Sequence, residues 1–207
     1  MAGLTAADLH DAMRSLAAIE PAFARGMARI GLPAPRVSAR GYATLLRTIV
    51  GQQVSVASAR AVYGRLAEAL GEGPAEMMLA SDEVLRGCGL SRQKAGYARS
   101  LAGLVASGAL DLAALPADDE AAVAELTRIK GIGRWSAEIY LLFAEGRPDI
   151  WPAGDLAVRI EVGRLLGLEN RPDEKATRAL AERWRPYRGA AAIFAWHHYN
   201  SDMGAPL

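Results

Sequence analysis

The segment with the most chemical content is a glycine turn rich in positive charge. It reads Thr127-Arg128-Ile129-Lys130-Gly131-Ile132-Gly133-Arg134-Trp135-Ser136, with basic side chains around both glycines and no acidic side chain. Glycine lets the backbone turn sharply and approach a partner closely. A helix that begins just after such a turn offers free N–H groups and the positive end of its dipole to an anion. The segment therefore predicts a binding site for one backbone phosphate, although a simple tight turn between two helices would have the same spacing.

The elements that must position this turn are predicted to be helices. Apolar residues recur at helical spacing along the chain, and the clearest sets are Tyr42, Leu45, Leu46, Ile49 and Val50, then Ala59, Val62, Tyr63, Leu66, Ala67 and Leu70, and Trp135, Ile139, Leu142 and Phe143. No sustained alternation with period two occurs, so strands are expected to be few or absent. The turn is predicted to lie between helices over roughly 119–128 and 134–145.

Proline and glycine divide the remaining chain into about ten short helices. Pro33 and Pro35 mark a loop over residues 30–41. Ser91 is a good N-cap for the helix that follows it, and Asp155 is placed to begin a helix that runs to about Gly167.

The composition limits the classes of protein to which the chain can belong. The chain has 207 residues, with 51% hydrophobic and 23% charged residues, which is ordinary for a soluble globular protein and excludes wholesale disorder. No apolar run reaches the roughly 18 residues of a membrane span, and charged residues near the start leave no core for a signal peptide. The single cysteine, Cys88, excludes an internal disulfide, a four-cysteine zinc site and a cysteine-ligated iron–sulfur cluster. A reducing cytosol is expected, while 24 basic against 23 acidic residues give no global indication of nucleic acid.

The segment from Leu126 to Ala137 resembles a helix–hairpin–helix motif. This motif followed by Asp155 resembles the pattern of the helix–hairpin–helix DNA glycosylase superfamily. Three further segments resemble the DNA-3-methyladenine glycosylase II family, namely residues 45–55, residues 89–95, and residues 184–188 with Trp196. Together the segments span about residues 42–196 in the order of the family. A lone glycine pair is weak evidence, but four matching segments in order are specific.

The resemblance implies an all-α fold of two helical lobes, with an active-site cleft between them. Residues 1–40 would pack with the C-terminal lobe, residues 41–148 would form the central lobe with the hairpin motif at 119–145, and residues 149–207 would carry the catalytic aspartate. A β-rich N-terminal domain and a cysteine-ligated cluster, which some relatives carry, are not expected here.

The resemblance assigns catalysis to Asp155. Cleavage of an N-glycosidic bond builds positive charge on the sugar, which a fixed carboxylate can stabilise while it orients a water. A plain helix cap, which contributes about 1 kcal/mol, is the alternative and is compatible with catalysis. Relatives that also nick the strand carry a lysine two residues after the second hairpin glycine, where this chain has Trp135. The resemblance therefore implies a monofunctional enzyme that uses water and leaves an abasic site.

Further roles carried over from the family concern the DNA. Trp135 and Trp196 would wall the pocket of a flipped base, with Ile139 and Tyr140 beside them, although both tryptophans could be ordinary core residues. Gln53 would be the wedge that fills the gap in the duplex, unless it or Gln52 only caps the next helix. Gly131, Gly133, Arg134 and Lys130 would hold the DNA backbone. The main-chain carbonyls of Thr127, Ile129 and Ile132 would bind a structural monovalent or divalent cation, and no other cofactor is expected to be required.

The sequence thus predicts a monomeric, monofunctional DNA glycosylase of base excision repair in a bacterial-type cytosol. Its partner would be double-stranded DNA containing damaged bases, with no membrane involved. It would release alkylated bases such as 3-methyladenine after base flipping. Three alternatives remain at this point: a glycosylase of another base specificity, a strand-nicking lyase, and a non-catalytic helix–hairpin–helix DNA-binding protein.

Overall fold

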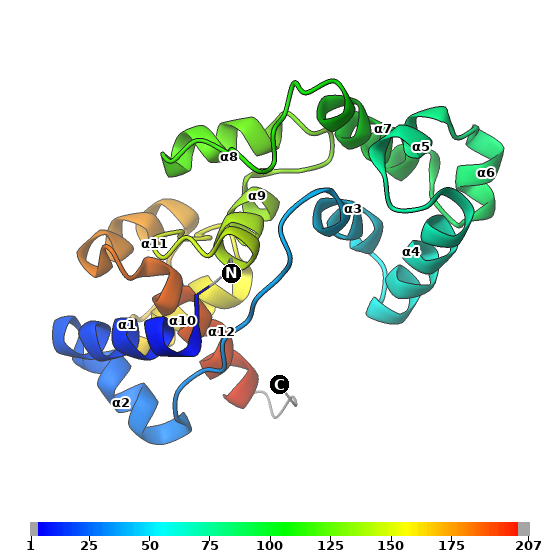
Figure 1. Ribbon diagram of the computed structural model, residues 1–207. Coiled ribbons are helices and arrows are strands. Elements are labelled where there is room, and N and C mark those ends of the chain that lie inside the picture. Colours follow the sequence, from blue (N-terminus) through cyan, green and yellow to red (C-terminus); the bar gives the residue numbers. More distant parts are fainter. Residues whose placement is uncertain (1–3, 203–207) are drawn as a thin grey trace. The chain divides into compact units, whose positions relative to one another are not determined.

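The computed structural model describes residues 4–202, and every regular element in that range is a helix (Figure 1). The prediction of an all-α fold is therefore confirmed for the described chain. None of the helices between residues 4 and 202 combines the length and the apolar character that a membrane span needs.

The chain forms two compact units, one made of the residues up to Ser38 and from Glu138 on, the other of Ala39–Ala137. The first unit contains α1 (Ala6–Ile19), α2 (Pro21–Ile30), the π-helical turn η1 (Leu141–Glu145), α10 (Leu156–Leu165), α11 (Glu174–Ala181), the 3-10 turn η2 (Glu182–Trp184) and α12 (Arg188–Asp202). The second contains α3 (Tyr42–Gly51), α4 (Val56–Leu70), α5 (Pro74–Leu79), α6 (Asp82–Gly87), α7 (Arg92–Ala106) and α8 (Asp119–Thr127). Helix α9 (Arg134–Tyr140) begins in the second unit and ends in the first.

The second unit ends at Ala137, whereas the sequence predicts that the central lobe ends at residue 148. The hairpin motif at residues 119–145 was expected to lie wholly within the central lobe, but residues from Glu138 on belong with the terminal helices. Three contacts explain this. Glu138 pairs with Arg178 of α11 at 3.0 Å, the Phe143 carbonyl accepts from the Ser38 N–H, and the Pro148 carbonyl accepts from the Gly189 N–H.

The core of the second unit follows the predicted apolar spacing. On α3 the side chains of Leu45, Leu46, Ile49 and Val50 are buried, and α3 packs against α7. Ser91 accepts a hydrogen bond from the Lys94 N–H at 3.2 Å and caps α7, as its residue type predicts.

The core of the first unit is aromatic. The buried ring of Trp184 meets Phe23 edge-on at 5.2 Å and Trp151 at 5.5 Å, and Phe23 meets Phe194 at 5.7 Å. These edge-to-face contacts are favourable arrangements of aromatic rings. They hold α2, η2 and α12 together and so fix the helix that carries Trp196.

Candidate active site

The glycine turn has the backbone that its sequence predicts. It connects the end of α8 at Thr127 to the start of α9 at Arg134. Gly131 has φ of +84°, in the left-handed region, and a Cβ atom there would overlap the Tyr97 ring. Gly133 faces open space, where a Cβ would have no heavy atom within 4 Å. Gly131 is therefore required by the turn itself, whereas Gly133 leaves room for something outside the protein.

Side chains from the residue after α3 and from α7 hold this turn. The Gln52 amide donates from Nε2 to the Gly131 carbonyl at 2.8 Å, and the Lys130 N–H donates to Ser100 Oγ at 3.1 Å. Sequence reasoning did not assign Gln52 or Ser100 to the hairpin, since each lies far from it along the chain.

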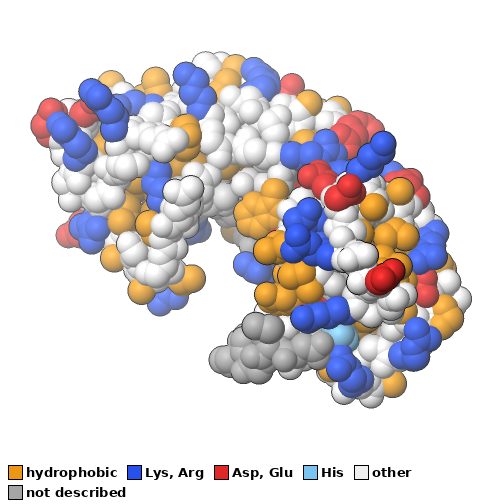
Figure 2. Space-filling view, turned by 180° about the vertical axis from the view of Figure 1, so that it is seen from behind, with side chains coloured by type: hydrophobic (Ala, Val, Ile, Leu, Met, Phe, Trp, Pro, Cys, Tyr) orange, Lys and Arg blue, Asp and Glu red, His pale blue; other side chains and the backbone are white. Residues whose placement is uncertain are grey.

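The charge at the turn is partly balanced within the protein. Arg134 pairs with Glu120 and Arg128 pairs with Glu125, so acids of α8 meet the arginines although the turn itself contains none. Lys130 is exposed, and no acid of residues 4–202 pairs with its side chain. On the face in Figure 2, basic and acidic side chains are interspersed. Of the basic side chains at the turn, Lys130 is therefore the one that no acid of residues 4–202 balances.

Gln53, the predicted wedge, lies in the turn after α3 and has an unusual backbone conformation. It is exposed and has φ of 56°, the left-handed region that non-glycine residues seldom adopt. The capping alternative fails here, because Ser55 caps α4 by accepting from the Ser58 N–H at 3.2 Å. Strained backbone conformations cluster at functional sites, so Gln53 is a candidate functional residue.

Asp155 is both the cap of α10 and the partner of an aromatic residue. Its Oδ1 accepts from the Val158 N–H at 3.0 Å and from Trp196 Nε1 at 3.1 Å. The carboxylate is half-buried at the start of a ten-residue helix. The structure thus brings Asp155 and Trp196 together.

The Trp196 indole also lines a cavity of about 400 Å³ in the first unit. Phe143 lies beside it, with ring centroids 5.6 Å apart and planes tilted by 37°. The remaining walls come from the loop before α3 and from α12, and they are Pro33, Ala34, Pro35, Arg36, Ile193, His197 and Asn200. Phe143 and Arg36 were not among the predicted pocket residues.

The other predicted pocket residues fall into two groups. Trp135 is 46% exposed at the start of α9, so it is not an ordinary core residue. Ile139 is half-buried, and Tyr140 is only 3% exposed. Trp135 belongs to the unit that carries the hairpin, whereas Ile139 and Tyr140 belong to the unit of Asp155 and Trp196.

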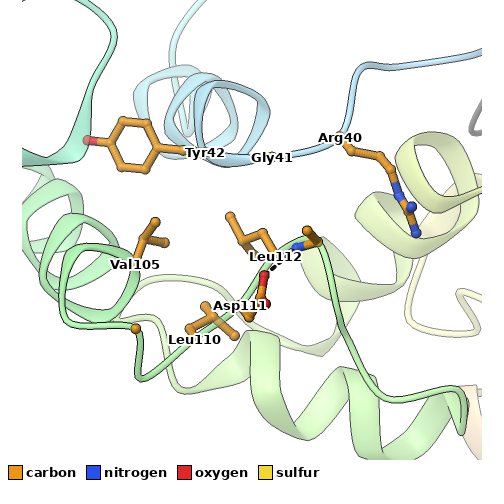
Figure 3. A pocket seen from close by; sticks show the side chains of 9 residues that line it. Arg40, Gly41, Tyr42, Val105, Leu110, Asp111 and Leu112 are labelled. Carbon is orange, nitrogen blue, oxygen red and sulfur yellow. Dashed lines mark hydrogen bonds between the residues drawn. The ribbon is translucent and has the colours of Figure 1, made fainter.

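A further cavity of about 510 Å³ lies in the second unit (Figure 3). Tyr42, Val105, Leu110 and Leu112 give it apolar walls, and Asp111 accepts from the Ala113 N–H at 2.8 Å. Burial, together with the nearby Tyr63 and Glu76, raises the pKa of Tyr42 to about 12. Of the predicted site residues, none lines this cavity.

Residues 4–202 contain no group of three or more His, Cys, Asp or Glu side chains that could hold a metal ion. The predicted cation site uses main-chain carbonyls instead. The Ile129 carbonyl accepts from the Ile132 N–H at 3.0 Å within the turn. A carbonyl has two lone pairs, so this bond is compatible with a cation on the same oxygen.

Comparison with known proteins adds the family. A family model described as HhH-GPD superfamily base excision DNA repair protein matches residues 46–186. DNA-3-methyladenine glycosylase 1 of Schizosaccharomyces pombe is 32% identical over 161 residues, which make up 75% of this chain and 71% of that protein. DNA-3-methyladenine glycosylase 2 of Escherichia coli is 29% identical over 184 residues, or 83% of this chain and 62% of that protein.

Two solved structures are similar over nearly the whole chain. The DNA-3-methyladenine glycosidase of Bacillus halodurans aligns with a TM-score of 0.83 and 30% identity, covering 93% of this chain and 91% of that one. The 3-methyladenine DNA glycosylase of Schizosaccharomyces pombe in complex with abasic DNA aligns with a TM-score of 0.76 and 29% identity, covering 93% and 97%. These matches confirm the resemblance found in the motifs, and the chain belongs to the HhH-GPD superfamily of base excision DNA repair proteins.

Proposed function

We propose that this protein is a monofunctional DNA glycosylase, which hydrolyses the N-glycosidic bond of alkylated bases such as 3-methyladenine in double-stranded DNA. The observation that carries the proposal is the Asp155 carboxylate, fixed by the α10 N-terminus and by Trp196 Nε1. Both contacts restrict the orientation of the carboxylate before substrate arrives. Preorganised charge of this kind is an effective way to stabilise a charged transition state.

In the proposed reaction the C1′–N bond breaks and its electron pair leaves with the base. Positive charge then develops on the sugar, where the Asp155 carboxylate stabilises it. A water oxygen forms the new bond to C1′, and its proton passes to the carboxylate or to solvent. The products are the free base and an abasic site.

Trp135 and the positions of two of the three lysines, Lys94 and Lys130, support hydrolysis without strand cleavage. A lyase step needs an amine that forms a Schiff base with the sugar, and Trp135 stands where the nicking relatives carry that lysine. Lys94 is engaged elsewhere, because its Nζ donates to the Val50 carbonyl at 2.7 Å. Lys130 lies within the hairpin turn, where a role on the DNA backbone is proposed for it instead.

The hairpin and the turn after α3 are proposed to bind the DNA backbone and to replace the flipped base. Gly131, Gly133, Lys130 and Arg134 would contact phosphate at the start of α9, and a structural cation would bind the carbonyls of Thr127, Ile129 and Ile132. Gln53 is exposed on a turn whose neighbour, Gln52, is bonded to Gly131. The hydrogen bond between Gln52 and Gly131 thus links the turn of the proposed wedge residue to the hairpin that is proposed to bind phosphate.

Trp135, Trp196 and Ile139 are proposed to contact the flipped base, and Tyr140 to support them from its buried position. Stacking on aromatic rings suits an alkylated base, because methylation at a ring nitrogen gives it positive charge. The names of the four relatives described above, which are 3-methyladenine glycosylases or glycosidases, support this substrate class. We further propose that the enzyme acts as a monomer in the cytoplasm.

The test is release of bases from methylated duplex DNA by the purified protein, measured by chromatography of the free bases. The expected result is free 3-methyladenine and an abasic product that stays uncut until treated with alkali. Borohydride is added in parallel, and no covalent protein–DNA adduct should form. Binding of DNA without base release would instead indicate a non-catalytic DNA-binding protein, and a trapped adduct would indicate a lyase.

A further inference from the structure

Lys94 lies in residues 89–95, a segment that resembles the family, and the proposed reaction leaves it without a role. Its Nζ donates to the Val50 carbonyl at 2.7 Å. Val50 lies in the last turn of α3, where carbonyls have no partner within the helix. A cation at this end of a helix also faces the negative end of the dipole. Lys94 therefore secures the end of α3, directly before the turn that carries Gln53.

Two further side chains of α7 contact the hairpin. Tyr97 lies one turn beyond Lys94, and its ring packs so closely against Gly131 that a Cβ atom there would come within 2.2 Å of it. Ser100 lies one turn further along, and its Oγ accepts from the Lys130 N–H at 3.1 Å. Residues three apart are neighbours on a helix surface, so successive turns of α7 hold first the end of α3 and then the hairpin.

Gln52 joins the two turns directly. Its Nε2 donates to the Gly131 carbonyl at 2.8 Å. The next residue, Gln53, has φ of 56°. Strained conformations of this kind persist only where the surrounding structure fixes them, and the bonds of Lys94 and Gln52 fix the residues just before Gln53. All of these residues belong to the second compact unit.

Base flipping requires the wedge and the hairpin to act on the same duplex. Unstacking a base costs free energy, which the inserted side chain must help to offset. A wedge turn that moved independently of the hairpin would have to be ordered on binding, and that ordering would reduce the free energy available for insertion. A turn that is already fixed relative to the hairpin avoids this loss, because phosphate binding then brings Gln53 to the duplex.

We propose that Lys94 and Gln52 are positioning residues, which hold the Gln53 turn at a fixed place relative to the hairpin and so couple phosphate binding to base flipping. The inference rests on the proposed glycosylase function, but it concerns the handling of the duplex and not the chemistry at Asp155. Both residues act through Gln53. Their loss should therefore slow insertion of the wedge and leave binding to undamaged DNA nearly unchanged.

The experiment separates insertion of the wedge from binding and from the reaction. Stopped-flow fluorescence of 2-aminopurine opposite a tetrahydrofuran abasic-site analogue measures insertion. Fluorescence anisotropy with an undamaged duplex at fixed salt measures binding. Single-turnover release of 3-methyladenine from methylated DNA measures the reaction.

Lys94→Met keeps the length of the side chain and removes the amine. Insertion and base release should both slow about tenfold, the effect of one hydrogen bond to a charged group, while binding to the undamaged duplex should stay within about twofold of wild type. Lys94→Arg should recover part of both rates, because it restores a charged donor. Gln52→Leu removes a neutral bond and should slow insertion about threefold to tenfold, and it provides the same test if Lys94→Met does not fold.

Arg99→Met is the matched control on the same helix. Arg99 donates from Nη2 to the Ala80 carbonyl at the end of α5 at 2.8 Å. Its replacement removes the same kind of bond, from a cation of α7 to a helix end, without a contact to the wedge turn or the hairpin. It should lower thermal stability and change neither insertion nor base release. Rate losses equal to those of Lys94→Met would show that such bonds are only structural.

A double-mutant cycle with Gln53→Ala tests whether Lys94 acts through the wedge. Once the wedge side chain is absent, Lys94→Met should slow base release by less than about twofold more, because both changes affect one step. Fully additive losses would overturn the inference, as would an equal fall in binding to the undamaged duplex. A wild type that inserts the wedge without releasing a base would reject the proposed function and leave this inference intact.

Discussion

Asp155 shows how one side chain serves structure and chemistry together. Its Oδ1 caps α10 through the Val158 N–H and also receives the Trp196 indole N–H. The cap alone would explain an aspartate at this position, since Ser, Thr, Asp and Asn all cap helices well. A helix cap does not require the hydrogen bond from the Trp196 indole, so this bond needs a separate explanation.

Replacement of Trp196 by Phe tests that contact. The variant keeps an aromatic wall and removes the donor to Asp155, so base release should fall about tenfold, within the range for a hydrogen bond to a charged group. Single-turnover kinetics and a thermal melt give the rate and the stability. Trp151→Phe is the control, because it removes an indole hydrogen bond of 3.2 Å to the Thr177 carbonyl in the same unit. Equal losses of rate in the two variants would show that the Trp196 contact is only structural.

Tyr42 gives a prediction about alkaline pH. Its pKa is raised from 10.0 to about 12 by burial and by the nearby Tyr63 and Glu76. The folded protein therefore holds this proton more tightly than the unfolded chain, and the stability that it contributes is complete below pH 10 and lost as the pH rises toward 12. Tyr42→Phe should lose less stability than wild type over that window, as measured by thermal melts at stepped pH. Parallel pH curves for the two proteins would contradict the assignment.

At the scale of the helices, the two hairpin glycines have different physical tasks. Gly131→Ala places a side chain at φ of +84° against the Tyr97 ring, so the free energy of unfolding should fall by about 1–3 kcal/mol. Gly133→Ala meets no protein atom within 4 Å, so it should fold normally.

Gly133→Ala should nevertheless weaken binding to an abasic duplex, because its methyl group stands where the DNA backbone is proposed to approach. Fluorescence anisotropy at fixed salt measures the affinity, and a thermal melt checks the fold. Unchanged affinity of a well-folded Gly133→Ala protein would remove Gly133 from the proposed DNA contact.

Local residue types predicted the helices of the hairpin closely. Helices were expected over roughly 119–128 and 134–145, and α8 covers Asp119–Thr127 while α9 and η1 together cover 134–145. The caps at Ser91 and Asp155 also follow from their residue types. Propensity, capping and glycine placement act over a few residues, so a short segment of sequence is enough to predict their effects.

Contacts between distant residues were not predictable in this way. Gln52 and Gly131 are 79 residues apart, and Trp196 and Asp155 are 41 apart. Helical spacing grouped Trp135 with buried residues such as Leu142, yet Trp135 is 46% exposed. Periodicity identifies residues that share a face of a helix, but neighbouring elements decide how much of that face is covered.

At the scale of the whole molecule, 24 basic residues face 23 acidic ones, and several arginines pair with these acids. The hairpin arginines meet acids of α8, and Arg185 and Arg188 both pair with Asp149, at 2.6 and 2.9 Å. Formal net charge is therefore a poor guide to DNA binding here. The proposed contacts involve Lys130, Arg134 and the backbone of the hairpin, so they need only local positive charge.

A buried polar network ties three helices of the first unit together. Glu161 of α10 is fully buried, its Oε2 lies 2.5 Å from His198 Nδ1 of α12, and its Oε1 accepts from Arg164 at 2.7 Å. Arg29 of α2 contacts His198 Nε2. Because a guanidinium can only donate, Nε2 is the acceptor and Nδ1 carries the proton that Glu161 receives. The network thus joins the helix that Asp155 caps to the helix that carries Trp196.

Glu161→Leu should reduce the free energy of unfolding by about 3–5 kcal/mol, because the partners of the carboxylate stay buried without it. The double variant Glu161→Leu/His198→Leu should recover part of that loss, since it replaces the pair with apolar side chains. Urea unfolding followed by circular dichroism measures both, with the exposed Glu169→Leu as control. A double variant whose loss equals the sum of the single losses would contradict the network.

The central claim is that the negative charge of Asp155 drives base release, and Asp155→Asn tests it most directly. Asparagine caps helices as well as aspartate does and still offers an oxygen to Trp196, so the variant removes charge while the fold is kept. Single-turnover release of 3-methyladenine should fall roughly 100-fold or more. Asp173→Asn, the same change at the exposed cap of α11, should leave the rate unchanged. A folded Asp155→Asn protein that releases 3-methyladenine at the wild-type rate would contradict the account.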